Sequence, residues 1–137
     1  MVIVILGVLS AVAIPVFTGK KDFDERGFFD ELLQAARYAQ KYAVVSNCNV
    51  LFSVTSNQFS LSIQPTPEHA HCGTSATALA LPGKPQGIYS PPGGITIVGA
   101  FSPNFLPSGR ASQGGVMQVG THRLEIHATT GFVERLP

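Results

Sequence analysis

The sequence has little charge and few cysteines. Only 12% of its 137 residues are charged, and a net charge of +1 gives no electrostatic reason to expect nucleic acid or an anionic membrane surface as a partner. The two cysteines, Cys48 and Cys72, are too few for a disulfide-built scaffold but sufficient for one disulfide bond. The length is that of a single domain.

Common catalytic and ligand-binding motifs are also missing. No serine lies in a Gly-x-Ser-x-Gly turn, and the chain has no phosphate-binding loop and no acidic loop suited to calcium. The acidic residues cluster mainly between positions 22 and 31. We therefore predict no enzymatic activity, no catalytic residues, no cofactor, no bound metal and no small-molecule substrate.

The apolar residues are concentrated in one N-terminal run. Residues 1–19 carry no charge, and as a helix they would span about 28 Å, roughly one hydrocarbon core. A core helix of this length is unusual in so small a domain, and no basic region precedes the run as in a signal peptide. Of these three interpretations we favour a single membrane helix that continues into the folded domain, with Lys20 and Lys21 at the membrane boundary.

Two local features suit this helix to packing against other helices outside the membrane as well as to the bilayer. Gly7, Ser10 and Ala13 are small residues that allow close approach of neighbouring helices. Pro15 removes one backbone hydrogen bond and bends or locally melts the helix. Such a helix can leave the bilayer and pack tightly against copies of itself.

The rest of the chain predicts an α+β fold, a long N-terminal helix followed by a β-rich domain of short antiparallel strands. Apolar residues recur at helical spacing over 22–46, and Ser46-Asn47 is a plausible stop. After Asn47 the period changes to two, which predicts a β-hairpin over 50–54 and 59–64. The segment 65–92 reads as an irregular loop. Later strands are predicted at 95–98, 101–105, 116–119, 124–128 and 132–135.

The string VIVILGVLSAVAIPVF, residues 2–17, resembles the N-terminal helix of type IV pilins and pseudopilins, in which such an apolar run ends in Ala-Ile-Pro. The family's prepilin peptidase site and the glutamate after it would precede this stretch and are absent. We infer that the sequence is a fragment, or that its start was placed at an internal methionine.

This resemblance implies a structural subunit. It would be a single-pass inner-membrane protein with its C-terminal domain in the periplasm, able to enter an extracytoplasmic filament. Its expected partners are other pilins or pseudopilins and the inner-membrane assembly platform. Residues 1–19 would form the transmembrane or filament-core half of the helix, 20–47 its amphipathic half, and 48–137 the β-rich periplasmic domain.

The C-terminal third carries a second resemblance. Phe101-Ser-Pro, Ser108-Gly-Arg, Gly114-Gly-Val, Leu124-Glu-Ile and Thr130-Gly-Phe-Val are similar to the GspH/FimT family of H-type pseudopilins and FimT-like minor pilins. The cysteine after the first helix and the ending without a basic tail favour the MSHA type of minor pilin. The implied machine is a type II secretion pseudopilus or a type IV pilus.

For an exported domain, a disulfide between Cys48 and Cys72 is the expected state. It would close a loop of about 25 residues and stabilise the fold by about 3 kcal/mol. A zinc site with His69 and His71, and two free thiols, are the alternatives. His122 and His127 lie on or beside a predicted strand and are an odd number of residues apart, so we expect surface histidines on opposite faces.

Two other functions stay open. One is a DNA-binding minor pilin in natural transformation: some FimT-like proteins bind DNA in that process through a C-terminal Gly-Arg-x-Arg pattern, whereas this chain has Gly131-Phe-Val-Glu-Arg135. Arg110, Arg123 and Arg135 could still form a small basic patch with weak, salt-sensitive DNA binding. A membrane-anchored periplasmic binding domain that never polymerises is the other alternative.

Overall fold

The computed structural model describes residues 3–5, 7, 19–85 and 87–137, and no helix within these ranges is both long and apolar enough to cross a membrane. Of the four small or kinking residues singled out in the N-terminal run, Gly7 is described and is exposed. Ser10, Ala13 and Pro15 lie outside the described residues, so the predicted roles of the N-terminal run stay predictions.

Helix α2 (Lys20–Ser46) is the long element of the fold. Its buried residues recur every three or four positions, the spacing that places side chains on one face of an α-helix: Phe28, Phe29, Leu32, Leu33, Ala35, Ala36, Ala39 and Ala43. The helix ends where the sequence predicted. Asn47 adopts the left-handed conformation (φ 57°) that terminates helices, and after glycine asparagine is the residue best able to do so.

The first sheet is built on the predicted hairpin, which is confirmed. Strands β1 (Asn49–Val54) and β2 (Phe59–Gln64) pair antiparallel, and their apolar side chains alternate with half-exposed ones. The sheet order is β3-β2-β1-β6, with β4 also pairing with β2. The additional strands are short: β3 (Thr77–Ala78), β4 (Ile88–Tyr89) and β6 (Asn104–Phe105).

The second sheet contains the C-terminal strands in the order β5-β7-β8-β9, all antiparallel. Its members are β5 (Ile97–Val98), β7 (Gly115–Val119), β8 (His122–Ile126) and β9 (Val133–Leu136). Each overlaps a predicted strand, but β5 is shorter than predicted and β8 begins two residues earlier. Periodicity located these strands, whereas their ends depend on pairing with neighbours.

The loop predicted over 65–92 is more ordered than its composition suggested. Besides β3 and β4 it holds a short 3₁₀ helix, η1 (Ala70–Cys72). The Tyr89 ring stacks on Phe59 with centroids 5.0 Å apart, and the Tyr89 hydroxyl accepts a hydrogen bond from the Leu81 N–H at 2.8 Å. The Lys84 ammonium contacts the Glu31 carboxylate at 2.6 Å. These tertiary contacts, which single-residue propensity does not reveal, order the loop.

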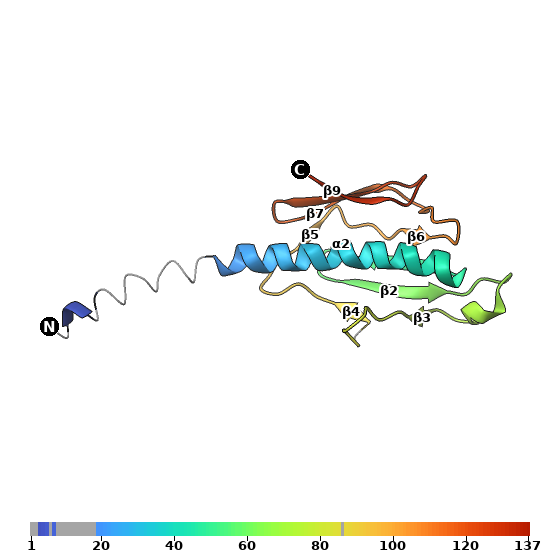
Figure 1. Ribbon diagram of the computed structural model, residues 1–137, viewed down its shortest axis with the longest axis horizontal. Coiled ribbons are helices and arrows are strands. Elements are labelled where there is room, and N and C mark those ends of the chain that lie inside the picture. The colour runs from blue at the N-terminus through green and yellow to red at the C-terminus, as the bar shows by residue number, and fades with distance from the viewer. Residues whose placement is uncertain (1–2, 6, 8–18, 86) are drawn as a thin grey trace.

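Helix α2 packs against both sheets; in Figure 1 strands β2, β3 and β4 of the first sheet lie on one side of it, and strands β7 and β9 of the second sheet lie on the other. Its side chains join residues of both sheets in one hydrophobic core. Four alanines of its C-terminal half, Ala35, Ala36, Ala39 and Ala43, have no exposed surface. Since alanine has the smallest apolar side chain, these positions let the strands approach the helix backbone from two sides.

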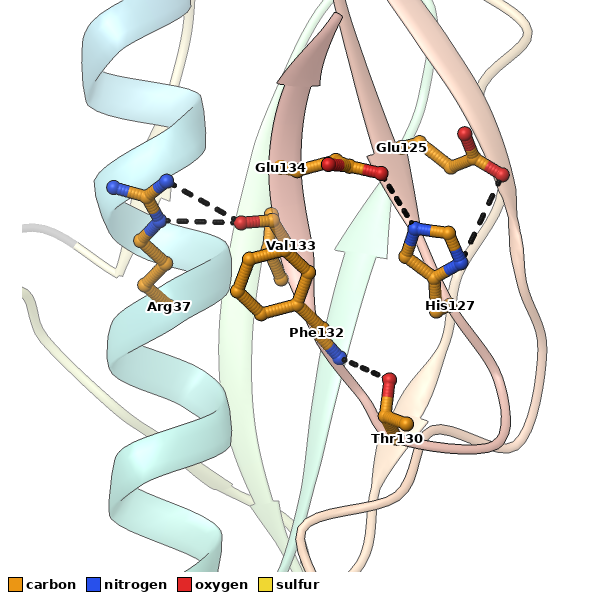
Figure 2. Close-up of polar contacts among 7 residues, drawn as sticks. All are labelled: Arg37, Glu125, His127, Thr130, Phe132, Val133 and Glu134. Atoms are coloured by element: carbon orange, nitrogen blue, oxygen red, sulfur yellow. Dashed lines mark hydrogen bonds and ion pairs between the residues drawn. The ribbon is translucent and has the colours of Figure 1, made fainter.

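Polar side chains of α2 attach the second sheet to the helix. The Gln40 amide donates to the Gly109 carbonyl at 2.9 Å and to the Thr130 carbonyl at 3.1 Å. The Arg37 guanidinium donates from Nε and Nη2 to the Val133 carbonyl, both at 3.3 Å (Figure 2). The two side chains thus give hydrogen-bond donors to carbonyl groups of two loops and of the edge strand β9.

Gly131 is required at the turn that Gln40 holds. Its φ is +66°, and a Cβ atom there would collide with the Gly109 carbonyl oxygen and approach the Gln40 Nε2 to 2.7 Å. Gly83 has a similar φ of +80° but open space around it, so it provides a matched control.

We predict that Gly131→Ala lowers the free energy of unfolding by about 3 kcal/mol, because backbone strain adds to the steric clash. Gly83→Ala should cost only about 1 kcal/mol, from backbone strain alone. Urea unfolding of the full chain in mild detergent measures both. Equal effects of the two substitutions would contradict the packing described for Gly131.

Candidate functional site

A stripe of exposed residues runs along α2, opposite its buried face. Its members follow helical spacing: Phe23, Gly27, Gln34, Lys41 and Val45. The side chains of Phe23 and Val45 are 80% and 87% exposed. An open groove of about 570 Å³ borders the start of this stripe, and Phe23, Arg26 and His122 are among its lining residues. The stripe therefore offers apolar contacts and a hollow to a neighbouring molecule.

The disulfide between Cys48 and Cys72 is present, as predicted for an exported domain. Both cysteines are buried, and their Cα atoms are 5.6 Å apart. Because both sulfurs are bonded to each other, neither is a thiolate that could hold zinc.

The histidines beside the disulfide contact the end of α2. The His71 Nε2 lies 2.8 Å from the Ser46 carbonyl oxygen, and the His69 Nε2 lies 3.0 Å from the Asn47 Nδ2. These polar contacts and the disulfide together attach η1 to the C-terminal end of the helix.

The three arginines predicted as a basic patch are not brought together. Arg135 faces the helix side of the sheet, with its guanidinium carbon 5.2 Å from the centre of the Phe29 ring and Nη1 3.8 Å from the Asp30 carboxylate. Arg123 lies next to Leu124, which pairs with Arg135, so its side chain faces the opposite side of the sheet.

Arg110 lies in a loop near the C-terminal end of strand β8, whereas Arg123 lies near the N-terminal end of that strand. The adjoining Ala111 N–H donates to the Ala128 carbonyl at 3.0 Å, and Ala128 is five residues, roughly 16 Å, beyond Arg123 along the chain. The DNA contact at Arg110, Arg123 and Arg135 stays a prediction, but these positions do not form one continuous cationic surface.

A polar cluster on the outer face of the second sheet was not predicted. Figure 2 shows the His127 ring between the carboxyl groups of Glu125 and Glu134. The His127 Nε2 is 2.7 Å from the Glu134 Oε1, and Nδ1 is 4.0 Å from the Glu125 Oε1. The hydrogen bond from His127 to Glu134, aided by the nearby carboxylates, raises the pKa of the His127 imidazole above its usual value of about 6.5.

The local sequence explains this cluster. Glu125 and His127 are two residues apart, so they share one face of the chain, and Glu125 pairs directly with Glu134 across the β8–β9 hairpin. His122, on the other face, has its ring centroid 5.3 Å from that of Phe29 on the helix. The expected separation of His122 from His127 is thus observed. In the sequence, the Glu-x-His spacing and the Thr130-Gly131 turn could have indicated that Glu125 and His127 share a face beside a hairpin. Only the strand register shows that Glu134 joins them.

Comparison with known proteins supports the fold assignment. No family model matches the chain, and no curated protein matches it significantly. A crystal structure of the type IV minor pilin FimU from Pseudomonas aeruginosa strain PAO1 is similar, with a TM-score of 0.55 and 14% sequence identity over 79% of this chain and 89% of that one. The long helix followed by antiparallel sheets is therefore a type IV pilin-like α+β fold.

We predict that replacing both cysteines by serine lowers the free energy of unfolding by about 3 kcal/mol, since the unfolded chain regains the entropy of the open loop. Urea unfolding of the oxidised full chain and of the variant measures this difference. A thiol reductant should destabilise the unmodified chain and leave the variant unchanged. Equal stability of the oxidised and variant chains would show that the disulfide does not constrain the fold.

A second prediction concerns pH. Because the pKa of His127 is higher in the folded than in the unfolded chain, its ion pair contributes its full stability below about pH 6.5. That stability is lost as the pH rises through the raised pKa. NMR titration of the His127 ring should find this pKa above 6.5, and lower in Glu134→Gln. Glu68→Gln, a change at a distant carboxylate, is the control, and a titration of His127 unaffected by Glu134→Gln would contradict the assigned cause.

Proposed function

We propose that this chain is a minor pilin or pseudopilin, a structural subunit of a type IV pilus or of a type II secretion pseudopilus. The pilin-like fold carries the proposal: a long helix embedded in a β domain continues, in sequence, from an uncharged N-terminal run. The similar solved protein is a type IV minor pilin. We assign no catalytic role, because subunits with this fold act through assembly.

The N-terminal run would anchor the subunit in the inner membrane before assembly, with the β domain in the periplasm. The Cys48–Cys72 disulfide is consistent with an oxidising compartment. In a filament the same helix would exchange lipid contacts for contacts with equivalent helices. Since lipid and protein interiors are similarly apolar, packing of small residues such as Gly7 must favour the assembled state.

The exposed stripe of α2 extends this contact surface into the described part of the helix. Phe23 lies near its N-terminal end, with most of its ring in solvent, and Val45 lies near its C-terminal end. A helix that only served its own domain would be expected to carry polar residues along this whole face. We propose that other pilins or pseudopilins cover the stripe, and that the assembly platform receives the N-terminal run.

The test is site-specific crosslinking in cells that make the filament. Cysteines introduced by Gly7→Cys and Phe23→Cys should crosslink the chain to pilin or pseudopilin subunits, because both positions would lie in the helix bundle. Gln113→Cys, at an exposed loop position, is the matched control and should give few such adducts.

The outcome separates the proposed roles. Adducts at Gly7 and Phe23 that depend on the filament-assembly ATPase would support a filament subunit. Membrane association without pilin adducts at either position would contradict assembly and favour a membrane-anchored periplasmic domain.

A further inference from the structure

The polar cluster on the outer face of the second sheet, formed by Glu125, His127 and Glu134, holds the His127 ring asymmetrically. A carboxylate can only accept hydrogen bonds, so the 2.7 Å contact with Glu134 places the proton on the His127 Nε2. In the neutral ring, Nδ1 then carries the lone pair, and it faces Glu125. The 4.0 Å between Nδ1 and the Glu125 Oε1 is too long for a hydrogen bond.

We propose that the His127 Nδ1 and the Glu125 carboxylate bind a divalent transition-metal ion of the zinc type, with Glu134 as the positioning residue that orients the ring. Bonds of about 2.0–2.2 Å from one tetrahedral ion place a nitrogen and an oxygen ligand roughly 3.4 Å apart. Closing the present gap requires a side-chain adjustment of less than about 1 Å. A carboxylate that accepts the second N–H of a ligating histidine is the usual outer partner at such sites.

The charges favour a cation at this place. Glu125 and Glu134 are directly paired across the hairpin, and like charges in that position destabilise a sheet. Ligand atoms of Glu125, His127 and Glu134 all lie within 4.8 Å of one another. Imidazole and carboxylate together suit zinc and its neighbours in the first transition row better than the purely oxygen-bound Mg²⁺ or Ca²⁺.

The cluster is also rigidly supported. The His127 N–H donates to the Phe132 carbonyl at 2.9 Å, and the His127 carbonyl accepts from the Gly131 N–H at 2.7 Å. The Phe132 ring stacks against the His127 ring with centroids 6.3 Å apart. Strand β9 is fixed in turn by the Arg37 contact with Val133 (Figure 2). Fixed ligands lower the entropy cost of binding, and side-chain exposures of 34% to 41% leave room for an ion and its waters.

Isothermal titration with Zn²⁺ tests the site on the oxidised full chain in mild detergent, at slightly alkaline pH after treatment with a chelator. We expect one ion per chain at submillimolar affinity. His127→Ala should abolish binding, and Glu125→Gln, which changes little of the shape, should weaken it at least about tenfold. The double variant His69→Ala/His71→Ala is the matched control, and its binding should equal that of the unmodified chain.

A separate measurement tests whether Glu134 orients the His127 ring. In the metal-free chain, ¹⁵N shifts of the His127 ring should show the proton on Nε2, and Glu134→Gln should redistribute it while weakening Zn²⁺ binding about tenfold. A proton found on Nδ1 in the unmodified chain would overturn the positioning role. No saturable Zn²⁺ binding, or binding that persists in His127→Ala and disappears in the His69/His71 variant, would overturn the site. None of these outcomes depends on filament assembly.

Discussion

The packing of one face of α2 against both sheets is the constraint on which the other features depend. Its C-terminal half presents alanines, which have no exposed surface, so that strands of both sheets pack close to the helix backbone. Larger side chains at these positions would push the sheets outward and break the continuity of the core. The longer side chains beside this stripe, Arg37 and Gln40, complete the packing by bonding backbone carbonyls of the second sheet and its turns.

The same packing divides the surface between two roles. One face of α2 is buried in the core. The opposite stripe, from Phe23 to Val45, stays exposed and is available for contacts outside the domain. The second sheet directs Leu124 and Ile126 towards the helix, so the intervening Glu125 and the following His127 must face outward. The proposed filament contact and the proposed metal site therefore lie on different surfaces, and each can be altered without removing the other.

Several features could be predicted from the sequence because they are local. Helical spacing and Asn47 indicated the extent of α2, alternation indicated the β1–β2 hairpin, and two cysteines in a chain expected to be exported indicated one disulfide. Features that depend on distant partners could not be predicted in this way. Strands β3 and β4 have only two residues each and exist through pairing with β2, which no periodicity reveals. The placement of the three arginines could not be predicted for the same reason, since strand register and turn positions decide which cations lie together.

The sequence by itself determined an α+β chain with an apolar N-terminal run, an amphipathic helix, a hairpin and a likeness to pilins, because hydrophobic period and turn chemistry are properties of neighbouring residues. Only the tertiary structure decided that the strands form two sheets on one helix, and that Arg123 and Arg135 face opposite sides. It also decided that Glu134 joins Glu125 and His127. These outcomes depend on strand register, and register is set by the pairing and burial of residues far apart in the chain.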